Sequence, residues 1–215
     1  MNNMLDIIYE DNHIIVVYKP KGILSQADGS NKEDMLSIIK DYIKEKYNKP
    51  GNVYLGLVHR LDINTSGIMV FAKTSKAAAR LSESIKNHTF MKKYKATVEG
   101  LLDNDNYIKL EDYILKNEKE RKAYISAKGQ YAYLEYKALK SYKIKNILVT
   151  DVDIILHTGR FHQIRCQMSN IGHPLYGDIK YGSVLSINND SFPLEAYYLS
   201  FPHPTTKEIL EFKRD

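Results

Sequence analysis

The sequence predicts an α+β protein built on a mixed, largely antiparallel sheet. Segments with a strand pattern outnumber helical ones along the 215 residues, and several neighbouring strands are separated by short turns that suit hairpins. Strands and helices do not alternate regularly, as they would in a parallel, doubly wound sheet. The sequence has no internal repeat, low-complexity tract or linker, so we expect residues 1–215 to form a single domain.

The composition is that of an ordinary globular protein. Hydrophobic residues make up 43% of the chain and charged residues 27%. The longest apolar run, residues 14–18, is far too short for a signal peptide or a membrane span. Cys166 is the single cysteine, which excludes an internal disulfide and favours a reducing compartment. We therefore expect a cytoplasmic protein.

The positive charge of the chain is concentrated in one stretch. The formal net charge is +5, and between Lys73 and Lys95 there are seven basic residues and one acidic residue, Glu83. A basic surface of this kind suits the phosphates of a nucleic acid. A lysine-rich helix face in solvent explains the same pattern equally well, so charge alone leaves both interpretations open.

The first part of the chain predicts a hairpin followed by a helix. Residues 7–9 and 13–18 have the apolar, β-branched pattern of two strands around a polar turn. Ser30 and Glu33 have the spacing of a capping box, which predicts a helix from there to about Tyr47. Apolar side chains recur along this helix at helical spacing, so we expect it to be scaffold.

A polar connection between two strands is the stretch around which the chain is organised. Residues 53–58 and 68–72 are mostly apolar and predict strands. Asp62 lies between them, and Gly67 permits a sharp reversal of the chain after it. A carboxylate at the end of a strand and before a tight turn is well mounted for chemistry, although an ordinary solvated turn has the same pattern.

The remaining elements continue the α+β pattern. A helix capped by Thr74 or Ser75 is expected to end near Asn87. Residues 101–128 are polar without a strong period and predict short strands with a mobile turn near residues 116–122. The other expected elements are strands at residues 93–99, 131–136, 147–156, 197–201 and 209–212, and a short helix at residues 161–170 that stops at Gly172.

Four motifs, in order along the chain, give it a family resemblance. They are residues 16–22, the segment His59-Arg60-Leu61-Asp62 with residues 65–67, residues 93–100 around Tyr94, and residues 156–165 with 172–178. Together they resemble the RluA-type RNA pseudouridine synthases of the RluA/RsuA superfamily, over residues 16–204. Gln26 and Glu195 depart from the family pattern at the rim of the site, and this bears on the choice of substrate.

The resemblance implies a fold and a reaction. The fold is that of pseudouridine synthases, in which an active-site cleft crosses a sheet flanked by helices and loops. The reaction is the isomerisation of particular uridines in structured ribosomal or transfer RNA. We expect a monomer without an obligatory protein partner and without an appended N-terminal S4-like RNA-binding domain.

No cofactor and no metal are expected. The isomerisation oxidises nothing and imports no group, so neither a redox cofactor nor ATP is needed. The seven histidines do not have the spacing of metal ligands.

The resemblance assigns catalysis to Asp62, Tyr94 and Arg165. Asp62 would act near the ribose C1′, either as a nucleophile or as the base that starts an elimination. Tyr94 would face the extruded uracil, although without the motif it is simply a core tyrosine on a strand. Arg165 would pair with Asp62 and keep that carboxylate ionised. The RNA-binding candidates carried over in the same way are Lys19, His59, Arg60, Thr65, Arg160 and Ile164, the last of which also suits the core.

Two other functions are compatible with parts of this pattern. A non-catalytic RNA-binding protein on the same fold would keep the basic surface, but it has no use for all three catalytic candidates. A glycoside hydrolase normally needs two carboxylates that flank the scissile bond, and Asp153 and Asp178 match no acid/base motif. The sequence leaves the RNA, the target uridine and the catalytic route open.

Overall fold

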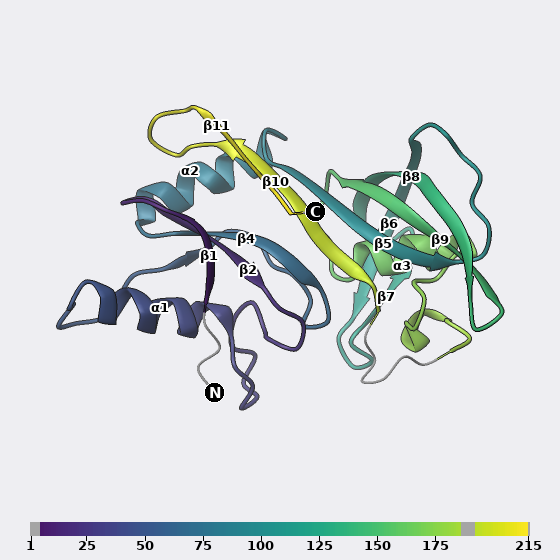
Figure 1. The fold of residues 1–215 in the computed structure, drawn as a ribbon, viewed down its shortest axis with the longest axis horizontal. Helices are drawn as coiled ribbons and strands as arrows, with labels where there is room; N and C mark the ends of the chain where they lie inside the picture. Colours follow the sequence, from purple (N-terminus) through teal and green to yellow (C-terminus); the bar gives the residue numbers. More distant parts are fainter. Residues whose placement is uncertain (1–4, 186–191, 215) are drawn as a thin grey trace. The chain divides into compact units, whose positions relative to one another are not determined.

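Antiparallel strands carry the fold in the computed structural model, which describes residues 5–185 and 192–214. The chain divides into two units, Met1–Met91 with Ala196–Asp215 and Lys92–Glu195, and each unit combines a sheet with helices (Figure 1). Eight strand pairs within these units, four in each, are antiparallel. The predicted α+β class with a largely antiparallel sheet is therefore confirmed.

The sheet of the first unit orders its main strands β1–β2–β4–β10. Its strands are β1 (Asp6–Glu10), β2 (Ile14–Lys19), β3 (Gly56–Leu57), β4 (Ser66–Ala72), β10 (Leu194–Pro202, which enters this unit at Ala196) and β11 (Ile209–Lys213). The predicted N-terminal hairpin and the predicted pair of closing strands are both present. In the middle, β2 and β4 pair along their whole length, so the strand after Asp62 is held inside the sheet.

The helix α1 (Met35–Lys46) begins later than the sequence predicts. Its N-cap is Asp34, whose side chain accepts a hydrogen bond from the Ser37 N–H at 3.1 Å. The expected capping box at Ser30 is wrong, because the Ser30 hydroxyl and N–H both bond to the side chain of Asp28 in a local turn. A short polar side chain that closes its own turn is not available to cap a helix.

The core of the first unit fills both faces of its sheet. Four consecutive residues of β2, Ile14 to Val17, are fully buried, and this requires cover on both faces. The helix α2 (Ser75–Lys86), capped by Thr74 as expected, packs Ala77 and Leu81 into the cluster on one face. Figure 1 shows α1 on the other side of β1, β2 and β4.

The strand expected at residues 53–58 is wrong in length, because β3 spans just Gly56–Leu57. Beyond β3, the Val70 N–H donates to the imidazole Nε2 of His59 at 3.1 Å. A side chain takes the bond that a neighbouring strand would otherwise accept, so the chain leaves the sheet before Asp62. Residues 58–65 form a loop instead.

The sheet of the second unit has the order β5–β9–β8–β6–β7. Its strands are β5 (Met91–Glu99), β6 (Ile108–Asn117), β7 (Lys122–Ile125), β8 (Gln130–Ile144) and β9 (Ile147–Leu156). The strands predicted at residues 93–99 and 147–156 are confirmed, whereas β8 is much longer than expected. The polar stretch 101–128 holds the β6–β7 hairpin, and most of β6 is exposed or half-buried, which explains why its apolar signal is weak.

A helix covers the inner face of the second sheet. The helix α3 (Gln163–Asn170) starts two residues later than expected, because His162 has a positive φ of 51°. Cys166 of α3 packs against residues of β6, β7 and β8 and against Tyr181 of the short 3-10 helix η1 (Ile179–Tyr181). Burial raises the pKa of the Cys166 thiol to about 11, so it stays protonated and unreactive.

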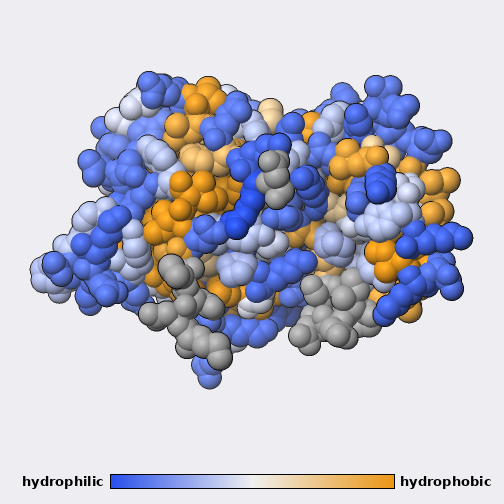
Figure 2. Space-filling model, in the orientation of Figure 1, coloured by the Kyte–Doolittle hydropathy of each residue, from blue (hydrophilic) through white to orange (hydrophobic). Residues whose placement is uncertain are grey.

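The surface is mostly hydrophilic on the face that Figure 2 shows, with apolar patches between the polar side chains. Across residues 5–185 and 192–214, no helix has the length and apolar character needed to cross a membrane.

Gly67 of β4 lies very close to Ala196 of β10, and a substitution there tests this packing. It has a φ of 137°, and a Cβ atom at this position would lie 2.4 Å from the backbone oxygen of Ala196. We expect Gly67→Ala to lower the free energy of unfolding by about 3 kcal/mol or more, because it adds backbone strain and a clash that no side chain can relieve. Gly22 has a φ of 87° with open space around it. The control Gly22→Ala should therefore cost about 1 kcal/mol, and equal losses in chemical denaturation would contradict this packing.

Candidate active site

The loop that carries Asp62 is held by the segment that follows β2. Ser25 bonds to both backbone groups of Leu61, since its hydroxyl donates to the carbonyl oxygen at 2.7 Å and accepts from the N–H at 3.0 Å. Further along, the Gly22 N–H donates to the Ile63 carbonyl at 2.8 Å. Asp62 therefore lies between two anchored residues, and its own side chain is half-buried.

Lys19 fixes the same loop from within the core. Its side chain is fully buried, and Nζ donates to the carbonyl oxygens of Pro20, Ile23 and Ile63 at 3.0, 2.7 and 3.3 Å. Burial lowers the pKa of Lys19 to about 8, and the nearby charge of Asp62 opposes that change. The ammonium group thus joins the segment after β2 to the Asp62 loop and adds a positive charge near its carboxylate.

The other candidates of the first unit surround Asp62 in sequence. The Thr65 N–H donates to the Asp62 carbonyl at 3.0 Å and closes a turn, and the Thr65 side chain is buried. His59 bonds to β4 and packs edge-on against Phe90, with ring centroids 5.4 Å apart. Arg60 is exposed. Of these three residues, Arg60 is the one that presents its side chain to solvent.

Tyr94 lies in the second unit, near the middle of β5. It is 5% exposed and pairs with Ile154 of β9. Along β5, buried Lys92, Tyr94 and Ala96 alternate with more exposed residues, so these three share the inner face of the strand.

Arg165 is a buried cation that several residues of its own unit hold in place. Its Nε donates to Asp178 Oδ2 at 2.6 Å and its Nη2 donates to Asp178 Oδ1 at 2.8 Å, which makes a bidentate pair. The guanidinium also lies over the rings of Tyr181 and Phe192, at 4.8 and 4.6 Å from their centroids. These contacts hold the guanidinium in one orientation.

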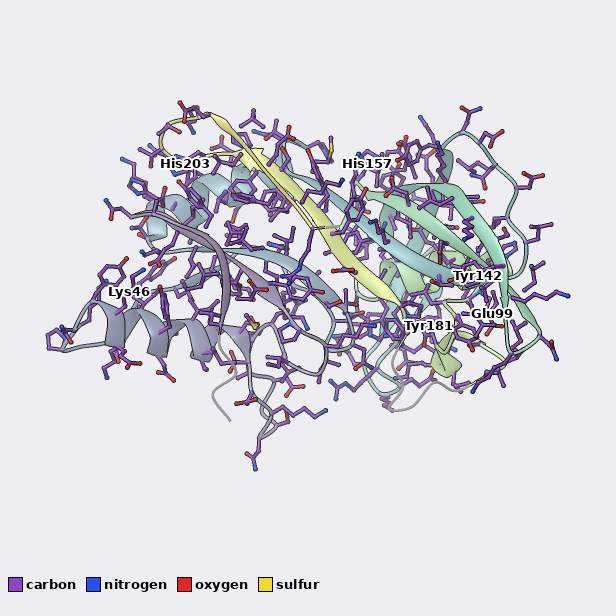
Figure 3. The ribbon with its side chains drawn as sticks, in the orientation of Figure 1. Lys46, Glu99, Tyr142, His157, Tyr181 and His203 are labelled. Carbon is purple, nitrogen blue, oxygen red and sulfur yellow. The ribbon has the colours of Figure 1, made fainter. Side chains whose placement is uncertain are left out.

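His162 completes this network from the N-terminus of α3. Arg165 Nη1 lies 2.9 Å from His162 Nε2, and His162 Nδ1 lies 3.0 Å from the hydroxyl of Tyr181, which is labelled in Figure 3. Burial, together with the charge of Arg165, lowers the pKa of His162 to about 2, so the ring is neutral. A neutral ring that accepts from Arg165 carries its proton on Nδ1 and donates to Tyr181.

The last two candidates flank this network. Arg160 is half-buried, and its Nε donates to the Tyr131 carbonyl at 2.8 Å while its Nη1 donates to Gln130 Oε1 at 3.2 Å. Ile164 is 5% exposed on α3.

The predicted site residues are thus divided between the two units. The first unit brings together Asp62, Lys19, His59, Arg60 and Thr65, and the second unit holds Tyr94, Arg160, Ile164 and Arg165. The expected pairing of Asp62 with Arg165 joins residues of different units and stays a prediction.

Three supporting residues escaped the sequence analysis. Ser25 has no motif around it, and its role depends on a contact with Leu61 far along the chain. Asp178 was considered as a glycoside hydrolase carboxylate and as part of the fourth motif, and its place in the same motif as Arg165 was a usable signal. His162 belongs to the fourth motif, but no particular role was predicted for it. Within the described residues, no group of His, Cys, Asp and Glu could hold a metal ion.

One family model matches the part of the chain that holds these residues. The model described as RNA pseudouridylate synthase matches residues 13–170, which include Asp62, Tyr94 and Arg165. This span is well over half of the chain. The chain belongs to the RNA pseudouridylate synthase family.

Relatives of this family cover nearly the whole chain. An uncharacterized RNA pseudouridine synthase of Aquifex aeolicus is 36% identical over 99% of this chain and 69% of its own length. Ribosomal large subunit pseudouridine synthase D of Zymomonas mobilis is 30% identical over 97% of this chain and 68% of its own length.

The solved structure of human RNA pseudouridylate synthase domain containing 1 has the same fold. It is similar with a TM-score of 0.76 at 24% identity, over 98% of this chain and 83% of that one.

Family membership identifies the reaction. The chain is an isomerase that converts uridine in RNA to pseudouridine, and RNA is its partner. The resemblance seen in the four motifs is confirmed.

The buried pair of Arg165 and Asp178 should contribute far more to stability than an exposed pair of the same type. Asp178→Asn leaves a buried guanidinium without its counter-charge, and we expect the free energy of unfolding to fall by about 3 kcal/mol. Asp6 pairs with Arg214, and both side chains are nearly half exposed. Asp6→Asn should therefore change stability by no more than about 0.5 kcal/mol. Similar losses for the two variants in urea denaturation would show that the buried network is not a structural unit.

Proposed function

We propose that this enzyme makes pseudouridine in large-subunit ribosomal RNA, with Asp62 as the carboxylate that acts at the ribose. The mounting of Asp62 is the observation that carries the proposal. Its loop is anchored on both sides by Ser25 and Gly22, its side chain stays half-buried, and a buried ammonium lies near it. Supporting the choice of RNA, several relatives are named ribosomal large subunit pseudouridine synthase D.

Asp62 has two routes open to it, and both balance without a co-reactant. In one, the carboxylate attacks C1′ as the bond from C1′ to uracil N1 breaks. In the other, it removes a ribose proton so that uracil leaves by elimination. In the first route the bond between Asp62 and C1′ breaks as uracil C5 bonds to C1′, and in the second the ribose proton returns from Asp62 to the sugar as the same bond forms. In both, the C5 proton is released and N1 takes up a proton. Each route needs an ionised carboxylate, which the nearby charge of Lys19 favours.

Tyr94 and Arg165 complete the proposed catalytic set from the second unit. Tyr94 would offer the extruded base an aromatic face and a hydroxyl near C5, where the proton is lost. Arg165 would pair with Asp62 and keep it ionised and oriented. Its fixed orientation supports this role, because the contacts with Asp178 and His162 remove the rotational freedom of a long side chain.

The RNA contacts are proposed according to exposure. The exposed side chain of Arg60 suits the RNA strand from which the uridine is extruded, and half-buried Arg160 suits a phosphate. The burial of Lys19 and Thr65, and the bond of His59 to β4, support a different role for these three, which would hold the Asp62 loop rather than touch RNA. Ile164 would pack in the core beneath the base.

The setting of the protein follows from this substrate. An enzyme that modifies ribosomal RNA before or during subunit assembly works in the cytoplasm of a bacterial cell, and bacterial relatives support that location. We propose that it acts as a monomer.

Release of tritium from RNA labelled at uracil C5 tests the proposal. Unmodified transcripts of large-subunit ribosomal RNA should release tritium, whereas a transfer RNA pool should not. Asp62→Asn should lower the rate at least about 100-fold with RNA binding intact, because it removes the ionised carboxylate and keeps the shape of the side chain. The control Asp6→Asn removes an exposed carboxylate and should keep the wild-type rate.

Each of the other outcomes would reject a separate part of the proposed function. Release only from transfer RNA would overturn the substrate and keep the reaction. Release by Asp62→Asn at the wild-type rate would overturn the role of Asp62. No release from either RNA, with binding intact, would favour a non-catalytic RNA-binding protein on the same fold.

A further inference from the structure

Lys92 is a buried lysine that the proposed mechanism does not use. It lies near the start of β5 and is 7% exposed. Tyr94 is two residues further along on the same face of the strand, so their Cα atoms are about 7 Å apart. Burial lowers the pKa of Lys92 to about 8, so the side chain still carries a proton at neutral pH.

The ammonium of Lys92 differs sharply from that of Lys19. Both side chains are buried, and burial lowers both pKa values to about 8. Lys19 Nζ is satisfied by three carbonyl oxygens and has the charge of Asp62 nearby. Among residues 5–185 and 192–214, no hydrogen bond or ion pair satisfies Lys92. Solvent still reaches Lys92 Nζ, which is not among the fully buried side-chain atoms that lack a partner, so the ammonium carries a desolvation cost that a bound anion would offset.

The position of Lys92 Nζ is defined by Gly159. A Cβ atom on Gly159 would lie 3.5 Å from Lys92 Nζ, so the ammonium lies directly beside this residue. Gly159 is exposed and carries no side chain. It belongs to the segment after β9 that begins at His157, labelled in Figure 3, and continues to Arg160. A cation beside an exposed glycine can be approached by an external group.

An anion is the group that this cation lacks. Within RNA, every nucleotide carries one phosphate, whereas uracil is neutral before its bond to the sugar is broken. Lys92 and Tyr94 share one face of β5, so a base at Tyr94 and a phosphate at Lys92 would lie on the same side of the strand.

We propose that Lys92 binds the phosphate of the uridine nucleotide that is being isomerised. This inference rests on the proposed function, because it takes Tyr94 as the residue that faces the base. The phosphate supplies the acceptor that the protein does not, and the ion pair fixes the sugar of the extruded nucleotide relative to the catalytic residues. Lys92 thus contacts the substrate at a point distant from the bonds that change.

The test uses a synthetic RNA hairpin that contains a uridine converted by the wild-type enzyme in large-subunit ribosomal RNA. Lys92→Met keeps the length of the side chain and removes its charge. We expect kcat/KM to fall about 10- to 100-fold, mainly through KM, because one charged hydrogen bond is lost. The slope of log affinity against log salt concentration should become shallower by about 0.7 to 0.9, the amount for one phosphate contact. The control Lys140→Met removes an exposed lysine of β8 in the same unit and should leave kcat/KM within about 3-fold.

A second arm changes the RNA instead of the protein. A methylphosphonate at the phosphate of the target uridine removes the same charge from the other side. It should lower kcat/KM of the wild-type enzyme by the same factor and have no further effect on Lys92→Met. Losses that simply multiply would show that the lysine and this phosphate do not interact. This arm tests the wild-type protein as well, so it does not depend on the folding of the variant.

Thermal unfolding separates this role from a structural one. A lysine kept for its substrate is not needed for the fold, so Lys92→Met should melt at the wild-type temperature or higher. A melting temperature lower by more than about 4 °C would indicate a structural role and overturn the inference. If the wild-type enzyme converts no uridine, the proposed function fails and the inference falls with it. If conversion is normal and Lys92→Met behaves like wild type, the inference alone fails.

Discussion

The structure around Asp62 depends on one constraint, namely that a loop outside the sheet must hold a carboxylate still. The sheet cannot do this directly, because β3 ends at Leu57 and the chain leaves it. Hydrogen bonds from the segment after β2 replace the missing ladder. Ser25 fixes Leu61 on one side of Asp62, and Lys19 and Gly22 fix Ile63 on the other. The four backbone-directed bonds restrict the loop without using the carboxylate itself, which stays available for chemistry.

The buried cations of this protein differ in whether the protein itself supplies their acceptors, and this difference separates positioning residues from a proposed substrate contact. Lys19 is satisfied by carbonyl oxygens, and Arg165 is satisfied by the carboxylate of Asp178 and the imidazole of His162. Lys19 fixes the loop of Asp62, and Arg165 is itself a residue that we assign to catalysis. Lys92 has no such acceptor in the described part of the chain, and this is why we assign it to the substrate. Burial alone does not show that a cation has a function, whereas a buried cation without an acceptor in the protein indicates an anionic ligand.

Local sequence patterns predicted the helices and strands well where the interactions of nearby residues determine them. The N-terminal hairpin, the Thr74 cap, β5 and β9 follow from alternation and capping chemistry within a few residues. The errors arose where a side chain bonds to a group that the local pattern does not reveal. His59 ends β3 by bonding to β4, and Ser30 fails as a cap because Asp28 takes its hydroxyl. The motifs identified the family and led to Asp62, Tyr94 and Arg165 as catalytic candidates. The roles of Ser25, Asp178 and Lys92 depend on contacts and burial, which the sequence does not show. The division into two units has no linker that composition would reveal.

The reaction depends on where the Asp62 carboxylate lies, and a change of one methylene group tests this. Asp62→Glu keeps the charge and moves the carboxylate outward by roughly 1 Å on a loop that cannot follow. We would measure the single-turnover rate of pseudouridine formation in unmodified large-subunit ribosomal RNA, at nucleotide resolution, together with RNA affinity. The account predicts a rate at least about 100-fold below wild type at every converted uridine, with affinity unchanged. A rate near that of the wild type would contradict it, because the carboxylate would then need no fixed position.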